Sequence, residues 1–157
     1  MAADPILVAA RETLAESLGE LRSTIEGLTV DELNARVAGE GTNPVAVIVT
    51  HALESTGAWL SIAVRREPPP RDRPAEFRTV AGDGFSGWVD GRIAGCLALL
   101  DGADAFDPSY EATAPWRVDD PDAPVTSAWA LMHALAHLGE HVGHAHVMRD
   151  VLTRRPT

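Results

Sequence analysis

The chain has 157 residues, of which 45% are hydrophobic, and this is enough apolar material for one domain with a substantial core. Its formal net charge of −10 and its lack of a basic cluster exclude the positive surface that binding to nucleic acid or to an anionic membrane requires. A single cysteine, Cys96, excludes an internal disulfide and suits a reducing cytoplasm, and neither a signal peptide nor an apolar stretch of membrane-spanning length is apparent. We therefore expect one cytoplasmic domain over residues 1–157, whose partners are neither nucleic acid nor membrane.

The first part of the sequence predicts one long helix and one short helix. Asp4 followed by a proline is a helix-start signal, and leucines that recur every three or four residues continue the pattern to a stop at Gly27. Thr29 and Glu32 then have the spacing of a capping box. We expect them to begin a short helix that reaches residue 36.

A second long helix follows Asn43, where the pattern of a capping residue and then a proline repeats. We expect this helix to end between residues 67 and 70, and the next residues, as far as 78, to form a loop because they are rich in proline and charge. His51 lies on the apolar face of the helix and should point into the bundle. A lone histidine in that position is usually a packed core residue, but the histidines near the C-terminus make a ligand role worth testing.

The remaining residues predict two more long helices separated by a long loop. The third long helix runs from about residue 83 to residue 100, with Trp88 and Cys96 on its apolar stripe. Residues 101–124 contain four prolines and no strand-like alternation, and Tyr110 or Trp116 from this loop could cover a site. The last helix runs from about residue 125 to residue 152. Four long helices without strands predict an all-α four-helix bundle with a long loop before the last helix.

Five of the six histidines lie within fourteen residues of the last helix. His133, His137, His141 and His144 recur every three or four residues and form one stripe, whereas His146 points to the far side of the helix, toward solvent. Histidines four residues apart lie about 6 Å apart at Cβ, so both can bind one transition-metal ion. The spacing alone leaves open whether the binding pair is His133 and His137 or His137 and His141.

Several motifs resemble the DinB/YfiT-like superfamily. In the last helix, the run His141-Val-Gly143-His144, followed by Arg149, resembles a signature in which H-x-x-x-H-x-G precedes a later arginine. Many members have glutamine where this chain has His144. The role of that histidine therefore stays open.

Upstream segments extend the resemblance over nearly the whole chain. Residues 43–51, which end in His51, resemble the second-helix motif of the superfamily, and residues 54–59 and 72–77 resemble its actinobacterial members. The resemblance implies a four-helix bundle in which three histidines bind a divalent ion. Carried over by position, these ligands are His51, His137 and His141.

The resemblance also implies a chemistry, because relatives include thiol S-transferases and mycothiol-dependent maleylpyruvate isomerase. Three neutral protein ligands leave a fourth position on the ion open, as is typical of a catalytic site. We expect zinc first, with nickel or iron as alternatives. The implied activity is that of a metal-dependent thiol S-transferase, in which the ion activates a low-molecular-weight thiol such as mycothiol for attack on an electrophile. Cys96 is expected to be a core residue, and no catalytic residue is assigned.

Arg149 is the residue that we expect to hold an acidic group of the thiol or the substrate. The same side chain could instead pair with Asp150 or Glu140, or stabilise the C-terminus of a helix. We also expect that a bundle of this kind can form a homodimer through exposed helix faces.

Two other functions remain open at this point. A metal-dependent hydrolase would attack with metal-bound water and would need a general base, for which Glu54 and Glu140 are the acidic neighbours of the predicted ligands in the sequence. A non-catalytic, stress-associated bundle would bind the metal without any activity.

Overall fold

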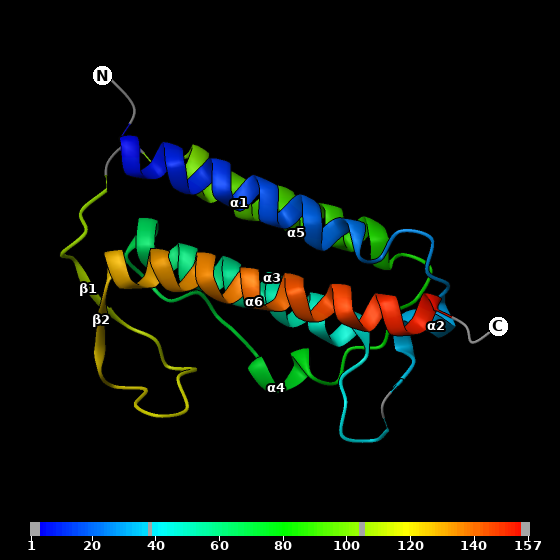
Figure 1. Ribbon diagram of the computed structural model, residues 1–157. Coiled ribbons are helices and arrows are strands. Elements are labelled where there is room, and N and C mark those ends of the chain that lie inside the picture. The colour runs from blue at the N-terminus through cyan, green and yellow to red at the C-terminus, as the bar shows by residue number, and fades with distance from the viewer. Residues whose placement is uncertain (1–3, 38, 104–105, 155–157) are drawn as a thin grey trace.

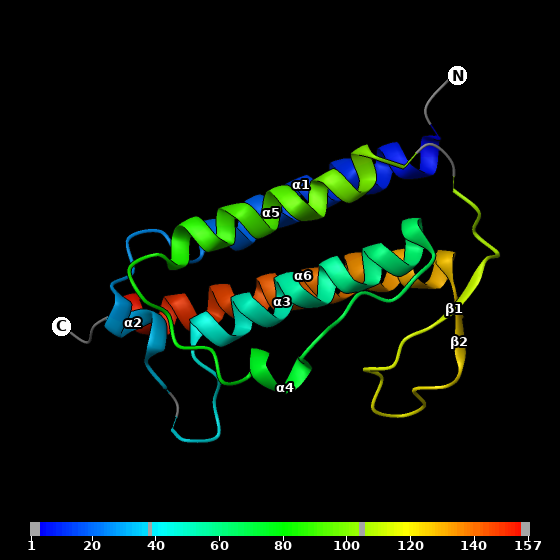
Figure 2. The same ribbon diagram turned by 180° about the vertical axis from the view of Figure 1, so that it is seen from behind.

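The structure is a computed structural model that describes residues 4–37, 39–103 and 106–154. The predicted all-α four-helix bundle is confirmed, and Figure 1 shows its four long helices side by side. They are α1 (Pro5–Ser23), α3 (Val45–Leu60), α5 (Phe85–Asp101) and α6 (Ser127–Thr153). α1 and α5 form one layer and α3 and α6 form the other, as Figures 1 and 2 show from opposite sides.

The local signals at the helix starts account for most of these boundaries. The Asp4 carboxylate accepts a hydrogen bond from the Ile6 amide at 2.8 Å and caps α1. Thr29 and Glu32 form the predicted capping box of α2 (Val30–Asn34), which ends two residues earlier than we expected. The prediction for α3 was wrong by one residue: Pro44 occupies the capping position with extended backbone, and no side chain caps this helix.

α3 is the central helix of the bundle, and a short π-helix, η1 (Ser61–Arg65), extends it. The combined segment Val45–Arg65 contains a window with a mean hydropathy of 1.3 and is long enough to cross a membrane. No stretch of this kind had been predicted from the sequence. However, 89% of its most apolar window is buried inside the bundle, so its packing explains its composition. The predicted core face of α1 is likewise buried, at Leu7, Ala10, Leu14, Leu18 and Leu21.

Three sequence predictions are corrected outside the long helices. Residues expected to be loop contain the short helix α4 (Arg73–Glu76), which the Asp72 carboxylate caps. The long loop contains two strands, β1 (Glu111–Thr113) and β2 (Pro124–Thr126), which pair antiparallel. Trp88 is 38% exposed instead of lying in the core. α4 lies along the side of the α3/α6 layer that faces away from α1 and α5, and the hairpin stands at the end of the bundle where α6 begins (Figures 1 and 2).

Candidate metal centre

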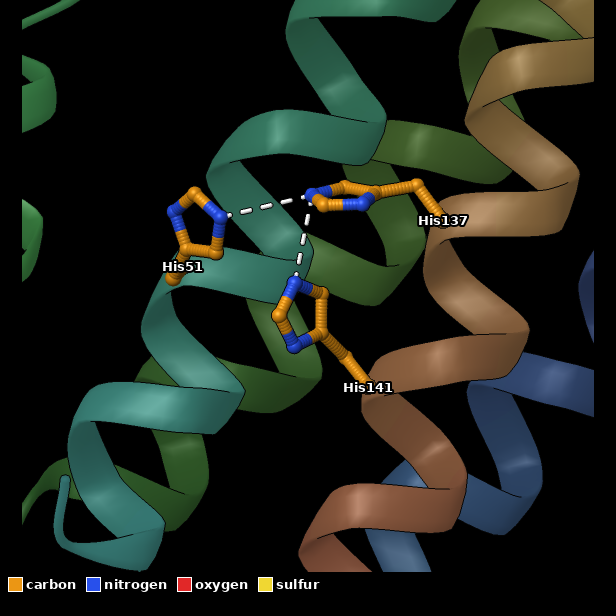
Figure 3. A group of neighbouring side chains, drawn as sticks. All are labelled: His51, His137 and His141. Atoms are coloured by element: carbon orange, nitrogen blue, oxygen red, sulfur yellow. Dashed lines mark hydrogen bonds between the residues drawn. The ribbon is translucent and has the colours of Figure 1, made fainter. Parts of the chain in front are cut away.

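The helices α3 and α6 bring three imidazole rings together, as Figure 3 shows. Nε2 of His137 lies 3.3 Å from Nε2 of His51 and 3.1 Å from Nε2 of His141. The candidate ligand atoms of the three residues all lie within 4.8 Å of one another. These are the three histidines that the resemblance selected, and the stretch between the first and the second spans most of the chain.

This arrangement fits a metal ion better than it fits a hydrogen-bonded cluster. Ligand nitrogens that are each 2.0–2.1 Å from a tetrahedral ion lie about 3.3 Å from one another, close to the two separations at His137. A proton on Nε2 of His137 could satisfy only one of its two nitrogen neighbours. A cation at the centre would accept all three lone pairs, so the residues present fit a divalent ion.

The orientation of His51 is fixed by a buried carboxylate. Nδ1 of His51 donates to Oε2 of Glu76 at 2.7 Å, and the two side chains are only 8% and 4% exposed. Arg71 binds the same carboxylate with Nε at 2.7 Å and a terminal nitrogen at 3.0 Å. Because the proton of His51 is held at Nδ1, its Nε2 presents a lone pair to His137.

The charge states suit this pattern of donors and acceptors. Burial alone would raise the pKa of Glu76, but the hydrogen bonds from His51 and Arg71 outweigh it and hold this pKa below its ordinary value. Burial, followed by the nearby His137 and His51, lowers the pKa of His141 to about 3. Burial likewise lowers the pKa of His137. At neutral pH, His137 and His141 are therefore uncharged, as a metal ligand must be.

The rings of His137 and His141 have weaker hydrogen-bond partners at Nδ1 than the ring of His51 has. Nδ1 of His137 lies 3.7 Å from a carboxylate oxygen of Glu140, whose side chain is 76% exposed. Nδ1 of His141 is buried and has no hydrogen-bond partner within the described part of the chain. The three candidate ligands are thus held unequally, and His51 has the firmest support.

The remaining three histidines of α6 are not part of this group of candidate ligands. The ring of His133 stacks on Trp129, with 4.6 Å between the ring centroids. The centroid of the His137 ring lies 5.3 Å from that of His133. His144 is exposed. His146, expected to face solvent, is partly exposed and contacts Glu20 at 3.2 Å. Between the two pairs that spacing left open, the structure brings only His137 and His141 together with His51.

A cavity of about 250 Å³ is lined by two of these three histidines, His51 and His137, and we call it the histidine cavity. Its aromatic and imidazole walls are His51, His133, His137, Trp59, Trp116 and Trp129. Its charged walls are Arg71, Arg73, Arg117 and Asp119. The long loop thus covers the site through Trp116, whereas Tyr110 lies below the Arg66 guanidinium, 5.0 Å from its ring centroid.

Arg149 occupies a different place from the one its predicted role suggested. It lies eight residues beyond His141, about 12 Å along the helix axis. Its guanidinium donates to the main-chain carbonyls of Ser23 and Thr24 at 3.1 and 2.9 Å, and so stabilises the C-terminal end of α1. A role in binding a thiol or a substrate stays a prediction for this residue.

A second cavity, of about 340 Å³, lies between α3 and α5, and we call it the α3/α5 cavity. It is lined by Glu54, Gly57, Arg71, Arg92, Cys96 and Leu99, among others. Glu54 forms an ion pair with Arg92 at 2.8 Å. Cys96 is buried, as predicted, and burial raises the pKa of its thiol to about 11. A thiol with that pKa is protonated and unreactive at neutral pH.

Sequence reasoning missed Glu76 and Arg71, the two residues that support His51. A signal was present, because residues 72–77 were part of the resemblance and Asp72 followed by Arg73-Pro74 has the form of a helix start. What the sequence did not indicate is that this turn packs on α3, where Glu76 meets a histidine 25 positions earlier.

Comparisons with known proteins agree with this fold. A family model described as mycothiol-S-transferase matches residues 9–154. The crystal structure of a conserved protein from Enterococcus faecalis is similar, with a TM-score of 0.71 and 18% identity over 98% of this chain and 100% of that chain, which shows a shared fold. A search of curated proteins found no match. Because the family model spans nearly all of the sequence, the chain belongs to the mycothiol-S-transferase family, within the DinB/YfiT-like group that its motifs predicted.

Proposed function

We propose that this protein is a metal-dependent thiol S-transferase, which joins mycothiol or a similar low-molecular-weight thiol to an electrophile in the histidine cavity. The observation that carries the proposal is the convergence of three Nε2 atoms, two of which belong to residues that line this cavity, His51 and His137. Membership of the mycothiol-S-transferase family supports the choice of thiol. The single reduced cysteine supports placing the activity in the cytoplasm.

In this proposal, His51, His137 and His141 hold a divalent ion, with zinc as our first choice and nickel or iron as alternatives. When bound, such an ion supplies the positive charge that lowers the pKa of a thiol placed next to it. Glu76 keeps the proton of His51 on Nδ1, so that Nε2 stays available as a ligand. Trp59, Trp116 and Trp129 give this cavity an aromatic wall, which would cover part of a bound thiol.

The chain's own groups favour an external thiol over the other nucleophiles. Cys96 cannot serve because its thiol is buried with a pKa of about 11. Of the two general bases that the sequence suggested for a hydrolase, Glu54 is paired with Arg92 and lines the α3/α5 cavity instead. Glu140 lies beside Nδ1 of His137, outside the set of residues that line the histidine cavity.

The test is a conjugation assay on zinc-loaded protein purified without a histidine tag, with mycothiol and 1-chloro-2,4-dinitrobenzene as the electrophile. We expect conjugation that needs both the thiol and the metal and that a chelator abolishes. His137→Ala should lose the activity, while the matched control His144→Ala, an exposed histidine on the same helix, should keep it. Ester hydrolysis without a thiol, or metal binding with no activity toward a panel of electrophiles, would contradict the proposal.

A further inference from the structure

Three arginines around the histidine cavity each lie over an aromatic ring. The distances from the guanidinium carbon to the ring centroid are 5.5 Å for Arg71 over Trp116 and 5.7 Å for Arg117 over Trp129. Arg73 lies over Phe77 at 5.3 Å. A guanidinium stacked in this way is held in place by its face, while its N–H edge stays free to bind an anion.

Only one of these three edges is fully used by the protein. The N–H groups along the edge of the Arg71 guanidinium donate to the buried Glu76 carboxylate. The nearest acid to Arg117 is Asp119, whose oxygen is 3.8 Å away, beyond hydrogen-bond distance, and whose side chain is 85% exposed. Among the described residues, Arg73 has no carboxylate within ion-pair distance.

The charge balance around the cavity is therefore the reverse of that of the whole chain. The protein carries a formal charge of −10, yet this small cavity has two cationic side chains without a close acidic partner. Because aromatic rings form part of the wall, a charge–charge contact made against them is less screened than one surrounded by water. Such a cavity selects for a negatively charged ligand.

The volume of the cavity indicates which of the two reactants it would hold. At about 250 Å³, it falls below the range of about 300 to 1,000 Å³ that is usual for pockets of drug-sized ligands. A small electrophile fits this space better than a sugar-based thiol such as mycothiol. His51 and His137 form part of the same wall, so a small molecule bound there lies beside the candidate metal centre.

We propose that the histidine cavity selects an electrophile that bears a carboxylate, which Arg117 and Arg73 bind through their free N–H edges. This inference rests on the proposed S-transferase function and names the class of its second substrate. It also assigns the role of anion partner, which the sequence analysis gave to Arg149, to two arginines that line the cavity. Arg149 is already bound to the carbonyls that end α1.

A binding experiment tests the proposal without any catalysis. Cinnamate and its neutral amide are titrated into zinc-loaded protein by isothermal titration calorimetry. We expect cinnamate to bind about tenfold or more tightly than the amide, because a charge-assisted contact to arginine is lost in the amide. Arg117→Gln and Arg73→Gln should each remove most of this preference and leave binding of the amide unchanged. Arg154→Gln, at an exposed arginine paired with Asp150, is the matched control and should change nothing.

A kinetic experiment assigns the carboxylate to the electrophile and separates the two proposals. With mycothiol as the thiol, 4-chloro-3,5-dinitrobenzoate should be used with a higher kcat/KM than its amide. Arg117→Gln should lower that value about tenfold for the acid alone. Equal use of acid and amide, or an effect of Arg117→Gln only on the KM of the thiol, would overturn the carboxylate site while leaving the S-transferase intact. If neither electrophile reacts but cinnamate binds as expected, the S-transferase proposal fails and the anion site stands.

Discussion

Two cavities share Arg71 as a wall, and they differ in the chemistry that they place beside a ligand. The α3/α5 cavity is the larger, at about 340 Å³ against about 250 Å³, and it contains the protein's single sulfur nucleophile. That thiol is protonated, since burial raises its pKa to about 11. The histidine cavity is lined by no cysteine, but its wall includes two of the three converging imidazoles, His51 and His137. Neither size nor the presence of a cysteine identifies the functional site here.

Opposite faces of α3 produce this contrast. His51, Ser55 and Trp59 lie four residues apart on the face that meets α6, and they line the histidine cavity. Glu54 and Gly57 lie on the face that meets α5, and they line the other cavity. α3 therefore presents the candidate metal ligand His51 on one face, and on the other face Glu54, which is paired with Arg92.

The largest effect outside the ligands themselves should come from Glu76→Gln. This change removes the carboxylate that orients His51, and loss of such a support typically lowers metal affinity about 10- to 100-fold. Competition with a chromophoric zinc chelator measures the affinity, and thermal unfolding checks that the variant is folded. Glu54→Gln, in the other cavity, is the matched control and should leave the affinity unchanged. An affinity for Glu76→Gln close to that of the wild type would contradict the account.

The pH dependence of stability should also separate the two cavities. Burial lowers the pKa of His141 from its ordinary value of 6.5 to about 3, so in this range the unfolded chain binds a proton that the folded chain does not. The free energy of unfolding of metal-free protein should therefore fall as the pH falls below 6.5. Cys96 acts in the opposite range, because its pKa rises from 9.0 to about 11 and the unfolded chain loses its proton first. Through Cys96, the free energy of unfolding should fall only as the pH rises above 9.

Urea unfolding of chelator-treated protein at about pH 7.5 and about pH 5 measures this difference. Glu76 does not interfere, since its pKa lies below its ordinary value of 4.5 and it stays ionised in both states above about pH 5. The wild type should unfold at lower urea at the lower pH, and His141→Gln should show a smaller decrease. An equal decrease in both proteins would show that His141 is not the group that titrates.

The smallest effect should come from Cys96→Ala. Conjugation activity and metal content should match those of the wild type, and stability should fall by about 1 kcal/mol because a buried side chain is shortened. Steady-state kinetics and urea unfolding measure the two quantities. A large loss of activity at unchanged stability would mean that the α3/α5 cavity takes part in the chemistry.

The four long helices could be predicted from the sequence because their signals are local. Apolar spacing and capping residues act within one or two turns, as at Asp4 and at the Thr29 capping box. The hairpin could not be predicted, since each of its strands has only three residues, too few for an alternating pattern to stand out from the loop around it. Its strands are held by pairing with each other, which a local pattern does not encode.

The candidate site also has parts that follow from local sequence signals and parts that depend on packing between distant segments. The spacing of His137 and His141 is a local property of one helix, and the resemblance supplied His51 as the third residue. The contact between His51 and Glu76 depends on how α4 packs against α3, so the spacing of residues along the sequence could not predict it. The cationic edges of Arg73 and Arg117 depend in the same way on the rings beneath them.

The most direct test is the metal content of protein purified without a histidine tag, measured by inductively coupled plasma mass spectrometry. The account predicts about one divalent ion per chain in the wild type and in His144→Ala, and a large loss in His51→Ala, His137→Ala and His141→Ala. Retention of the ion in His141→Ala together with its loss in His133→Ala would contradict the proposed centre.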